Sequence, residues 1–65
     1  MKVTVNGDAR DLPDGETIRA LIARYQLEAG KVAVELNRRL LKSEKYDQAL
    51  KDGDEVELVT FVGGG

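Results

Sequence analysis

The sequence has 65 residues, of which ten are basic and twelve acidic, and its formal net charge is −2. A chain of this length forms one domain with a modest core, so a large internal active site is not expected. The sequence contains neither cysteine nor histidine, which excludes disulfides, thiolate nucleophiles, imidazole bases and the commonest soft-metal ligands. It also lacks the positive charge of a nucleic-acid binder, so we expect no nucleic-acid partner.

The hydropathy of the sequence bears on the cellular compartment of the protein. No apolar run is long enough to form a signal peptide or a membrane span. We therefore expect a cytoplasmic protein that has no membrane partner. The absence of cysteine is compatible with that compartment.

Alternating apolar residues open the chain, since every second residue of 1–5 is apolar. This period of two predicts a strand with one buried face. Asn6-Gly7 follows, and because both residues tolerate positive φ, the pair predicts a two-residue hairpin turn leading into a second strand at residues 8–12. In the next segment, Leu12-Pro13-Asp14-Gly15, we expect a type I turn with Pro13 at its second position and glycine at its exit.

One amphipathic helix is predicted after this turn. Its apolar stripe has i, i+3, i+4, i+7 spacing and consists of Ile18, Leu21, Ile22 and Tyr25. Thr17 can cap the first turn by accepting a hydrogen bond from a free backbone N–H. We expect the helix to end between Tyr25 and Ala29, and Gly30 to stop any extension by adopting a left-handed conformation.

The second half of the sequence predicts three further strands. Residues 32–36 alternate apolar and small or polar side chains up to the polar group Asn37-Arg38-Arg39, and a short strand is expected at Leu40 and Leu41. Residues 42–50 are mostly polar and can hold one helical turn, with anchoring side chains expected at Tyr46, Ala49 and Leu50. Residues 55–62 are rich in β-branched and aromatic side chains and form the last predicted strand.

The order of these elements is hairpin, helix, two strands and a final strand. If the first and last strands pair in parallel, one face beneath the helix gathers four apolar side chains, those of Val3, Val5, Val56 and Leu58. This arrangement predicts an α+β fold of the β-grasp type, with a mixed sheet of about four to five strands packed on one main helix. We expect residues 1–62 to form the domain and residues 63–65 to be a flexible tail.

Charged residues form two clusters that have both structural and functional interpretations. The acidic cluster consists of Asp52, Asp54, Glu55 and Glu57, and the basic cluster of Arg38, Arg39, Lys42 and Lys45. The acidic cluster is predicted to be a solvated turn and strand edge, because hard-cation loops draw converging oxygens from a longer register. A solvated surface is also favoured for the basic cluster, although it could dock an acidic partner. The other acidic residues show no pairing that marks a general acid and base.

The last predicted strand has an outward face with apolar side chains. If Val56 and Leu58 point to the core, Val59 and Phe61 point away from it, near Ala33 on the neighbouring strand. Together with Val62, these side chains could form a contact patch that binds a partner. Folding of Phe61 over the sheet edge is the alternative, and the sequence leaves it open.

Gly63-Gly64-Gly65 is the strongest functional signal. The structural interpretation of the glycines is a frayed terminus. The functional interpretation is that a tail without Cβ atoms can enter a narrow channel and bring its carboxylate to another protein. If that carboxylate attacks the α-phosphate of ATP, it becomes a mixed anhydride from which a sulfur nucleophile can displace AMP. Such a chain could carry sulfur without a cysteine.

Several segments resemble the thiamine-biosynthesis sulfur carriers of the ThiS family. They are Val3-Thr4-Val5-Asn6-Gly7, Val32-Ala33-Val34-Glu35-Leu36-Asn37, Asp52-Gly53-Asp54-Glu55-Val56-Glu57 and Phe61-Val62-Gly63-Gly64-Gly65. The chain length and the Phe-Val-Gly-Gly-Gly ending are the specific features, because the strands alone fit any ubiquitin-like protein. The small subunit of molybdopterin synthase, MoaD, is the nearest functional relative of this family, but MoaD proteins look longer and commonly carry prolines before the terminal glycines.

The resemblance implies a ubiquitin-like carrier that is not itself an enzyme. Gly65 would be adenylated by an E1-like enzyme, ThiF, which uses ATP, and would then become a thiocarboxylate with sulfur from a cysteine desulfurase. Thiazole synthase, ThiG, would receive that sulfur, while Gly63 and Gly64 would give the tail access to its partners. No metal or cofactor is expected on the isolated chain. The alternatives are a molybdopterin-type or tRNA-thiolation carrier, a ubiquitin-like protein modifier, and an interaction module whose glycines are a loose end.

Overall fold

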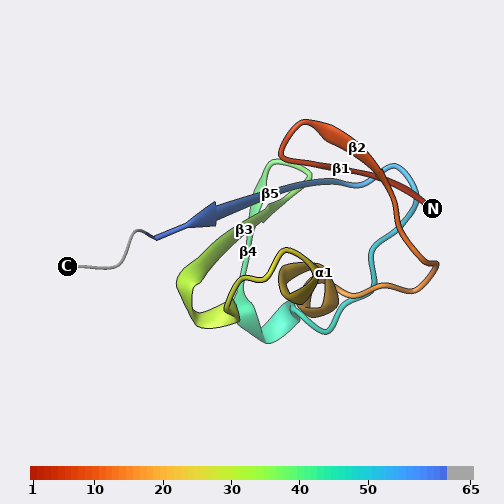
Figure 1. Ribbon diagram of the computed structural model, residues 1–65. Helices are drawn as coiled ribbons and strands as arrows, with labels where there is room; N and C mark the ends of the chain where they lie inside the picture. The colour runs from red at the N-terminus through yellow and green to blue at the C-terminus, as the bar shows by residue number, and fades with distance from the viewer. Residues whose placement is uncertain (62–65) are drawn as a thin grey trace.

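The computed structural model describes residues 1–61 of the chain. Within this part, five strands form one mixed sheet in the order β2-β1-β5-β3-β4, and helix α1 packs on one face of it (Figure 1). The strands are β1 (Lys2–Val5), β2 (Asp8–Asp11), β3 (Val32–Leu36), β4 (Arg39–Leu41) and β5 (Glu55–Thr60). The helical elements are α1 (Ile18–Arg24) and two short 3-10 turns, η1 (Ala29–Lys31) and η2 (Ser43–Lys45).

The first hairpin forms as predicted. Asn6 and Gly7 have φ values of 51° and 85°, and they join Val5 to its antiparallel partner Asp8. The prediction for the next turn was wrong by one residue, because the Glu16 amide donates to the Pro13 carbonyl at 3.2 Å and Pro13 therefore occupies the first position. Leu12 lies outside that turn because it is buried and its amide bonds to the Met1 carbonyl.

Helix α1 begins where the sequence predicts, with the Thr17 hydroxyl accepting a hydrogen bond from the Ala20 amide at 3.1 Å. It ends at Arg24, one residue before the predicted interval, and Gln26 rather than Gly30 takes the left-handed conformation, with φ 60°. The amides of Gln26 and Leu27 bond to the carbonyls of Ala23 and Ile22, which is the hydrogen-bond pattern of a Schellman motif. These two bonds satisfy free carbonyls of the last turn and end the helix early.

The core lies between α1 and the inner face of the sheet. β1 and β5 pair in parallel, and their inward residues Val3, Val5, Val56 and Leu58 are buried, as predicted. Tyr46 and Leu50 anchor the segment around η2 by burial, but Ala49 is exposed, so the prediction that it is an anchor was wrong. Ala49 instead forms a backbone bridge with Thr17, whereas the following residue, Leu50, is buried.

One ion pair beside the core was not predicted. The side chain of Glu16 is only 5% exposed and receives two hydrogen bonds from Arg24, at 2.6 Å and 2.9 Å. These bonds, and the negative charge of Glu16, raise the pKa of Arg24 above its usual value.

Helices within residues 1–61 are too short and too polar to cross a membrane. The predicted domain of residues 1–62 and the tail of residues 63–65 have their boundary outside the part of the chain that the structure describes.

Candidate functional site

Strand β5 is the central strand of the sheet and leads toward the C-terminal residues. It pairs in parallel with β1 at Glu55 and Val56, and antiparallel with β3 from Val56 to Thr60. Figure 1 shows that β5 continues past the turn of the β1–β2 hairpin. The beginning and the end of β5 therefore have different neighbours, and we describe them separately.

Asn37, at the turn between β3 and β4, fixes the beginning of β5. Its backbone amide donates to the Glu55 carbonyl at 2.7 Å, and its side-chain oxygen accepts from the Glu55 amide at 2.9 Å. Its Nδ2 also donates to Asp54 Oδ1 at 3.0 Å, while the Lys51 amide donates to Asp54 Oδ2 at 2.8 Å. Asp54 is only 9% exposed, so the prediction that it belongs to a solvated turn was wrong. Its carboxylate instead accepts hydrogen bonds from two loops and so joins them.

Asn6, in the first hairpin turn, fixes the middle of β5 from the other side. Its amide donates to the Val56 carbonyl at 2.9 Å, and its Oδ1 accepts a hydrogen bond from the Leu58 amide at 2.8 Å. From the sequence, Asn6 was predicted only as a turn residue and Asn37 only as the end of a strand. The two share a sequence signal, because each asparagine directly follows an alternating apolar strand. In the structure both adopt positive φ, at 51° and 52°.

The end of β5 presents the apolar patch that the alternation predicts. Val59 is 46% exposed and pairs with Ala33, while Phe61 is 61% exposed and its amide donates to the Lys31 carbonyl at 3.1 Å. Phe61 therefore does not fold over the sheet edge. Leu40 on β4 is 71% exposed as well, an exposure that was not predicted. Val62, the third predicted member of the patch, lies outside the described residues.

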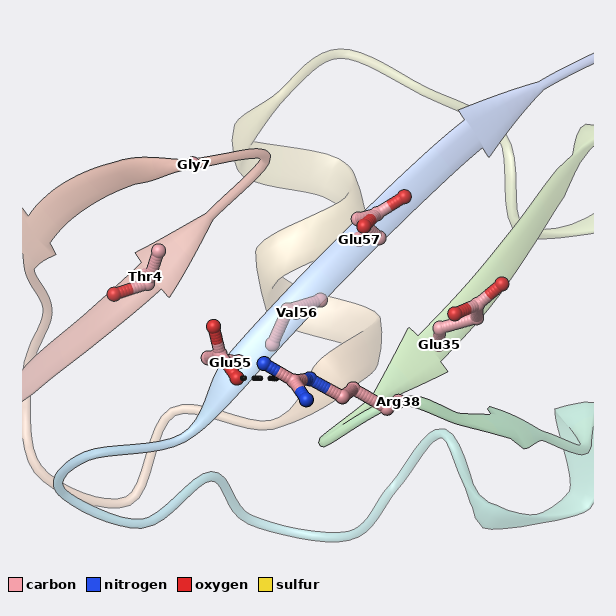
Figure 2. Close-up of a pocket in the computed structure, with 7 residues that line it drawn as sticks. All are labelled: Thr4, Gly7, Glu35, Arg38, Glu55, Val56 and Glu57. Carbon is pink, nitrogen blue, oxygen red and sulfur yellow. Dashed lines mark ion pairs between the residues drawn. The ribbon is translucent and has the colours of Figure 1, made fainter.

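A shallow hollow of about 230 Å³ lies on the open face of the sheet beside this patch (Figure 2). It is lined by Thr4, Gly7, Glu35, Arg38, Glu55, Val56 and Glu57. Glu35 and Glu57 are directly opposite each other on β3 and β5, an arrangement that like charges disfavour, and Arg38 Nε lies 3.9 Å from Glu55 Oε1. The hollow therefore carries excess negative charge and suits a basic side chain of a partner better than it suits acid–base catalysis.

The remaining predicted site residues are surface residues or lie beyond the described part. All four members of the basic cluster, Arg38, Arg39, Lys42 and Lys45, are exposed, as expected of a solvated surface. In residues 1–61 no group of three or more acidic side chains is arranged to hold a metal ion. The absence of a bound metal or cofactor stays a prediction. Gly63, Gly64 and Gly65 lie outside the described residues.

A mixed sheet wrapped over one helix, with its central strand leading to the C-terminal residues, defines a ubiquitin-like β-grasp protein. A ubiquitin-like protein from the archaeon Caldiarchaeum subterraneum has the same fold, with a TM-score of 0.56 at 21% identity over 98% of this chain and 100% of that chain. A much closer structural match is the crystal structure of a thiamine biosynthesis protein, ThiS, from Geobacter metallireducens. That match has a TM-score of 0.81 at 36% identity and covers 100% of both chains.

The sequence model of the ThiS family matches residues 3–65, and the chain belongs to this family. It is 44% identical over 63 residues to the sulfur carrier protein ThiS of Bacillus subtilis, covering 94% of this chain and 96% of that protein. It is also 39% identical over 66 residues to a thiazole synthase of Paramagnetospirillum magneticum. All of this chain is covered in that match, but it spans only 20% of the thiazole synthase.

Proposed function

We propose that this protein is a sulfur carrier for thiazole formation in thiamine biosynthesis, and that the carboxylate of Gly65 carries the sulfur. The observation that carries the proposal is the family match, which extends through the three glycines to Gly65. The near-complete overlap with a relative named as a sulfur carrier supports it. The chain itself would present the Gly65 carboxylate, and its partners would supply catalysis.

The chemistry that we propose proceeds in three steps on Gly65. The carboxylate attacks the α-phosphate of ATP, and pyrophosphate leaves, which gives a glycyl adenylate. A sulfur nucleophile then attacks the carbonyl carbon, and AMP leaves. We assign the first step to an E1-like adenylating enzyme, ThiF, and the supply of sulfur to the persulfide of a cysteine desulfurase. Attack by the outer sulfur of the persulfide gives an acyl disulfide. A thiol reductant then cleaves its S–S bond, which releases the thiocarboxylate of Gly65 and leaves the two thiols joined as a disulfide. Gly63 and Gly64 would let the tail enter narrow channels because neither residue has a Cβ atom.

We propose thiazole synthase, ThiG, as the acceptor of the sulfur. A thiazole synthase of Paramagnetospirillum magneticum contains a region resembling this whole chain in 20% of its length. Two functions joined in one polypeptide meet at high effective concentration, so a carrier-like region inside a thiazole synthase is expected where the two act together. The exposed Val59 and Phe61, with Val62, would form the contact patch for these enzymes.

The test is sulfur loading followed by mass spectrometry of the intact chain. Incubation with ATP, a sulfur donor and the cognate adenylating enzyme should increase the mass by the replacement of one oxygen with sulfur. Deletion of Gly65 should abolish this change, and Gly64→Ala should slow it, because a Cβ atom narrows the fit and restricts the backbone. Loading of the deletion variant, or sulfur anywhere other than the terminal carboxyl, contradicts the proposal.

The identity of the acceptor is tested separately. Thiocarboxylated chain should support thiazole formation by thiazole synthase and should not support molybdopterin synthesis or tRNA thiolation. An isopeptide bond between Gly65 and a protein lysine in the same incubation would instead indicate a protein modifier. We also expect the isolated chain to bind neither zinc, magnesium nor ATP in calorimetric titrations.

A further inference from the structure

The C-terminal half of β5 has one paired edge and one open edge. Along β5, the backbone groups of alternate residues face opposite sides. The Glu55 carbonyl and the Phe61 amide bond to the β3 side, at Asn37 and Lys31, whereas the Asp54 and Val56 carbonyls accept from β1 and its turn. The backbone N–H and C=O groups of the even-numbered residues of β5 therefore face β1. Because β1 ends at Val5, the backbone of Thr60 faces a position that no strand of residues 1–61 occupies.

The open edge begins at a defined point. Asn6 Oδ1 accepts from the Leu58 amide and occupies the last position that the first hairpin can reach. Beyond it, the Leu58 carbonyl and both the amide and the carbonyl of Thr60 have no hydrogen-bond partner within residues 1–61. Figure 2 shows that β5 extends beyond the hairpin turn that contains Gly7. The unpaired groups match the donor and acceptor pattern of an extended backbone.

This edge also lacks the features that usually protect an edge strand. Natural edge strands are often short, charged or interrupted by proline. β2, at one outer edge of the sheet, follows that rule, because three of its four residues are charged and all are exposed. Residues 58–61, by contrast, are Leu-Val-Thr-Phe and contain no charge and no proline. The sheet is thus protected at this outer edge but open beside the strand that leads to the tail.

We propose that an extended segment of a partner enzyme pairs with this open edge, next to Leu58 and Thr60, and so adds a strand to the sheet. The inference rests on the proposed function, because it assigns the docking of the enzymes that act on Gly65. A strand paired at Thr60 fixes the direction of β5 five residues before Gly65. It thereby reduces the conformational freedom that the tail must lose on entering a catalytic site.

The surface beside the open edge of β5 indicates which side chains the partner segment should carry. Glu57, which lines the acidic hollow, and Val59 lie on the outer face of β5 immediately beside the open position. Phe61 continues the same face. Residues at every second position of an added strand share one face, so the segment should place a lysine or arginine near Glu57 and an apolar side chain near Val59.

The test compares two substitutions at one residue in complexes with the cognate adenylating enzyme and thiazole synthase. Thr60→Pro removes the amide that faces the open edge but none of the hydrogen bonds to β3, and Thr60→Ala keeps that amide. We expect Thr60→Pro to raise Kd at least about tenfold for one or both enzymes, and Thr60→Ala to change it less than about twofold. Unfolding temperatures within about 4 °C of the parent would establish that both variants fold.

Hydrogen exchange of the unmodified chain provides a readout that needs no variant. The Thr60 amide should exchange freely in the isolated chain and at least about 100-fold more slowly in the saturated complex. If Thr60→Pro does not fold, N-methylation of Thr60 by chemical synthesis removes the same donor.

Three outcomes would overturn the edge proposal. They are unchanged exchange of Thr60 in a saturated complex, equal weakening by proline and alanine, and a homodimer in sedimentation that protects Thr60 without any enzyme. The first two outcomes, with normal sulfur loading on Gly65, would leave the proposed carrier function intact. Failure of the unmodified chain to load sulfur would instead reject the carrier function.

Discussion

The two halves of β5 contrast in how they are held. The first half lies between β1 and β3 and is fixed by the side chains of Asn6 and Asn37. The second half pairs only with β3 among the described residues and exposes Val59. One strand thus has a first half that is held on both sides and a second half that partners can reach. For a carrier this division is useful, because pairing on both sides holds the first half in the sheet while partners can reach the open edge of the second half.

Valines on the two faces of β5, one in each half, test this contrast most strongly. Val56 is 2% exposed in the first half, whereas Val59 is 46% exposed in the second. Val56→Ala should lower the free energy of unfolding by about 2 to 3 kcal/mol, because it removes buried methyl groups and leaves a cavity. Val59→Ala should lower it by at most about 0.5 kcal/mol. Chemical denaturation measures both, and similar losses would mean that Val59 contributes to the core as much as Val56 does.

The turn between β3 and β4 sharpens the comparison, because adjacent residues should respond with opposite sign. Asn37→Gly permits the same positive φ but deletes the side-chain bonds to Asp54 and Glu55, so we expect a loss of about 2 kcal/mol. Arg38 has φ 69° and is exposed. Arg38→Gly should relieve backbone strain and stabilise the fold by about 0.5 to 1 kcal/mol. Equal effects at both positions would show that the turn, rather than the asparagine side chain, fixes β5.

Phe61 should show the smallest effect on stability and a clear effect on binding. Because its side chain is 61% exposed, Phe61→Ala should change the free energy of unfolding by less than about 0.5 kcal/mol. Its Kd for the adenylating enzyme or thiazole synthase should rise at least about tenfold, as expected when an aromatic contact residue is truncated. Leu40→Ala is a matched control, because Leu40 is exposed on another strand. A large loss of stability with unchanged binding would place Phe61 in the core.

Predictions from local patterns succeeded where neighbouring residues alone set the conformation. The Asn6-Gly7 turn, the Thr17 cap and the bounds of β3 follow from φ preferences, capping chemistry and alternation, and the structure confirms all three. One local prediction failed because a nearer motif competed with it. Gly30 did not end the helix, because Gln26 and Leu27 completed a Schellman motif first.

Some features of the candidate site could be predicted from local patterns, and others could not. Alternation along β5 predicted the exposure of Val59 and Phe61, because side chains of a strand point to opposite faces whatever its neighbours are. The burial of Asp54 could not be predicted, because its partner Asn37 lies 17 residues away in the sequence. The acidic hollow was also missed, since Glu35 and Glu57 become neighbours only when β3 pairs with β5.

The sequence by itself determined the order of elements, the buried stripes of α1, β1, β3 and β5, the β-grasp arrangement and the proposed chemistry of the glycine tail. These properties depend on side-chain periodicity, glycine conformation and residue type, which are local. Only the tertiary structure decided which asparagines hold β5, which carboxylate is buried and where the sheet stays open. Those features depend on strand register, and register brings together residues that the sequence keeps far apart.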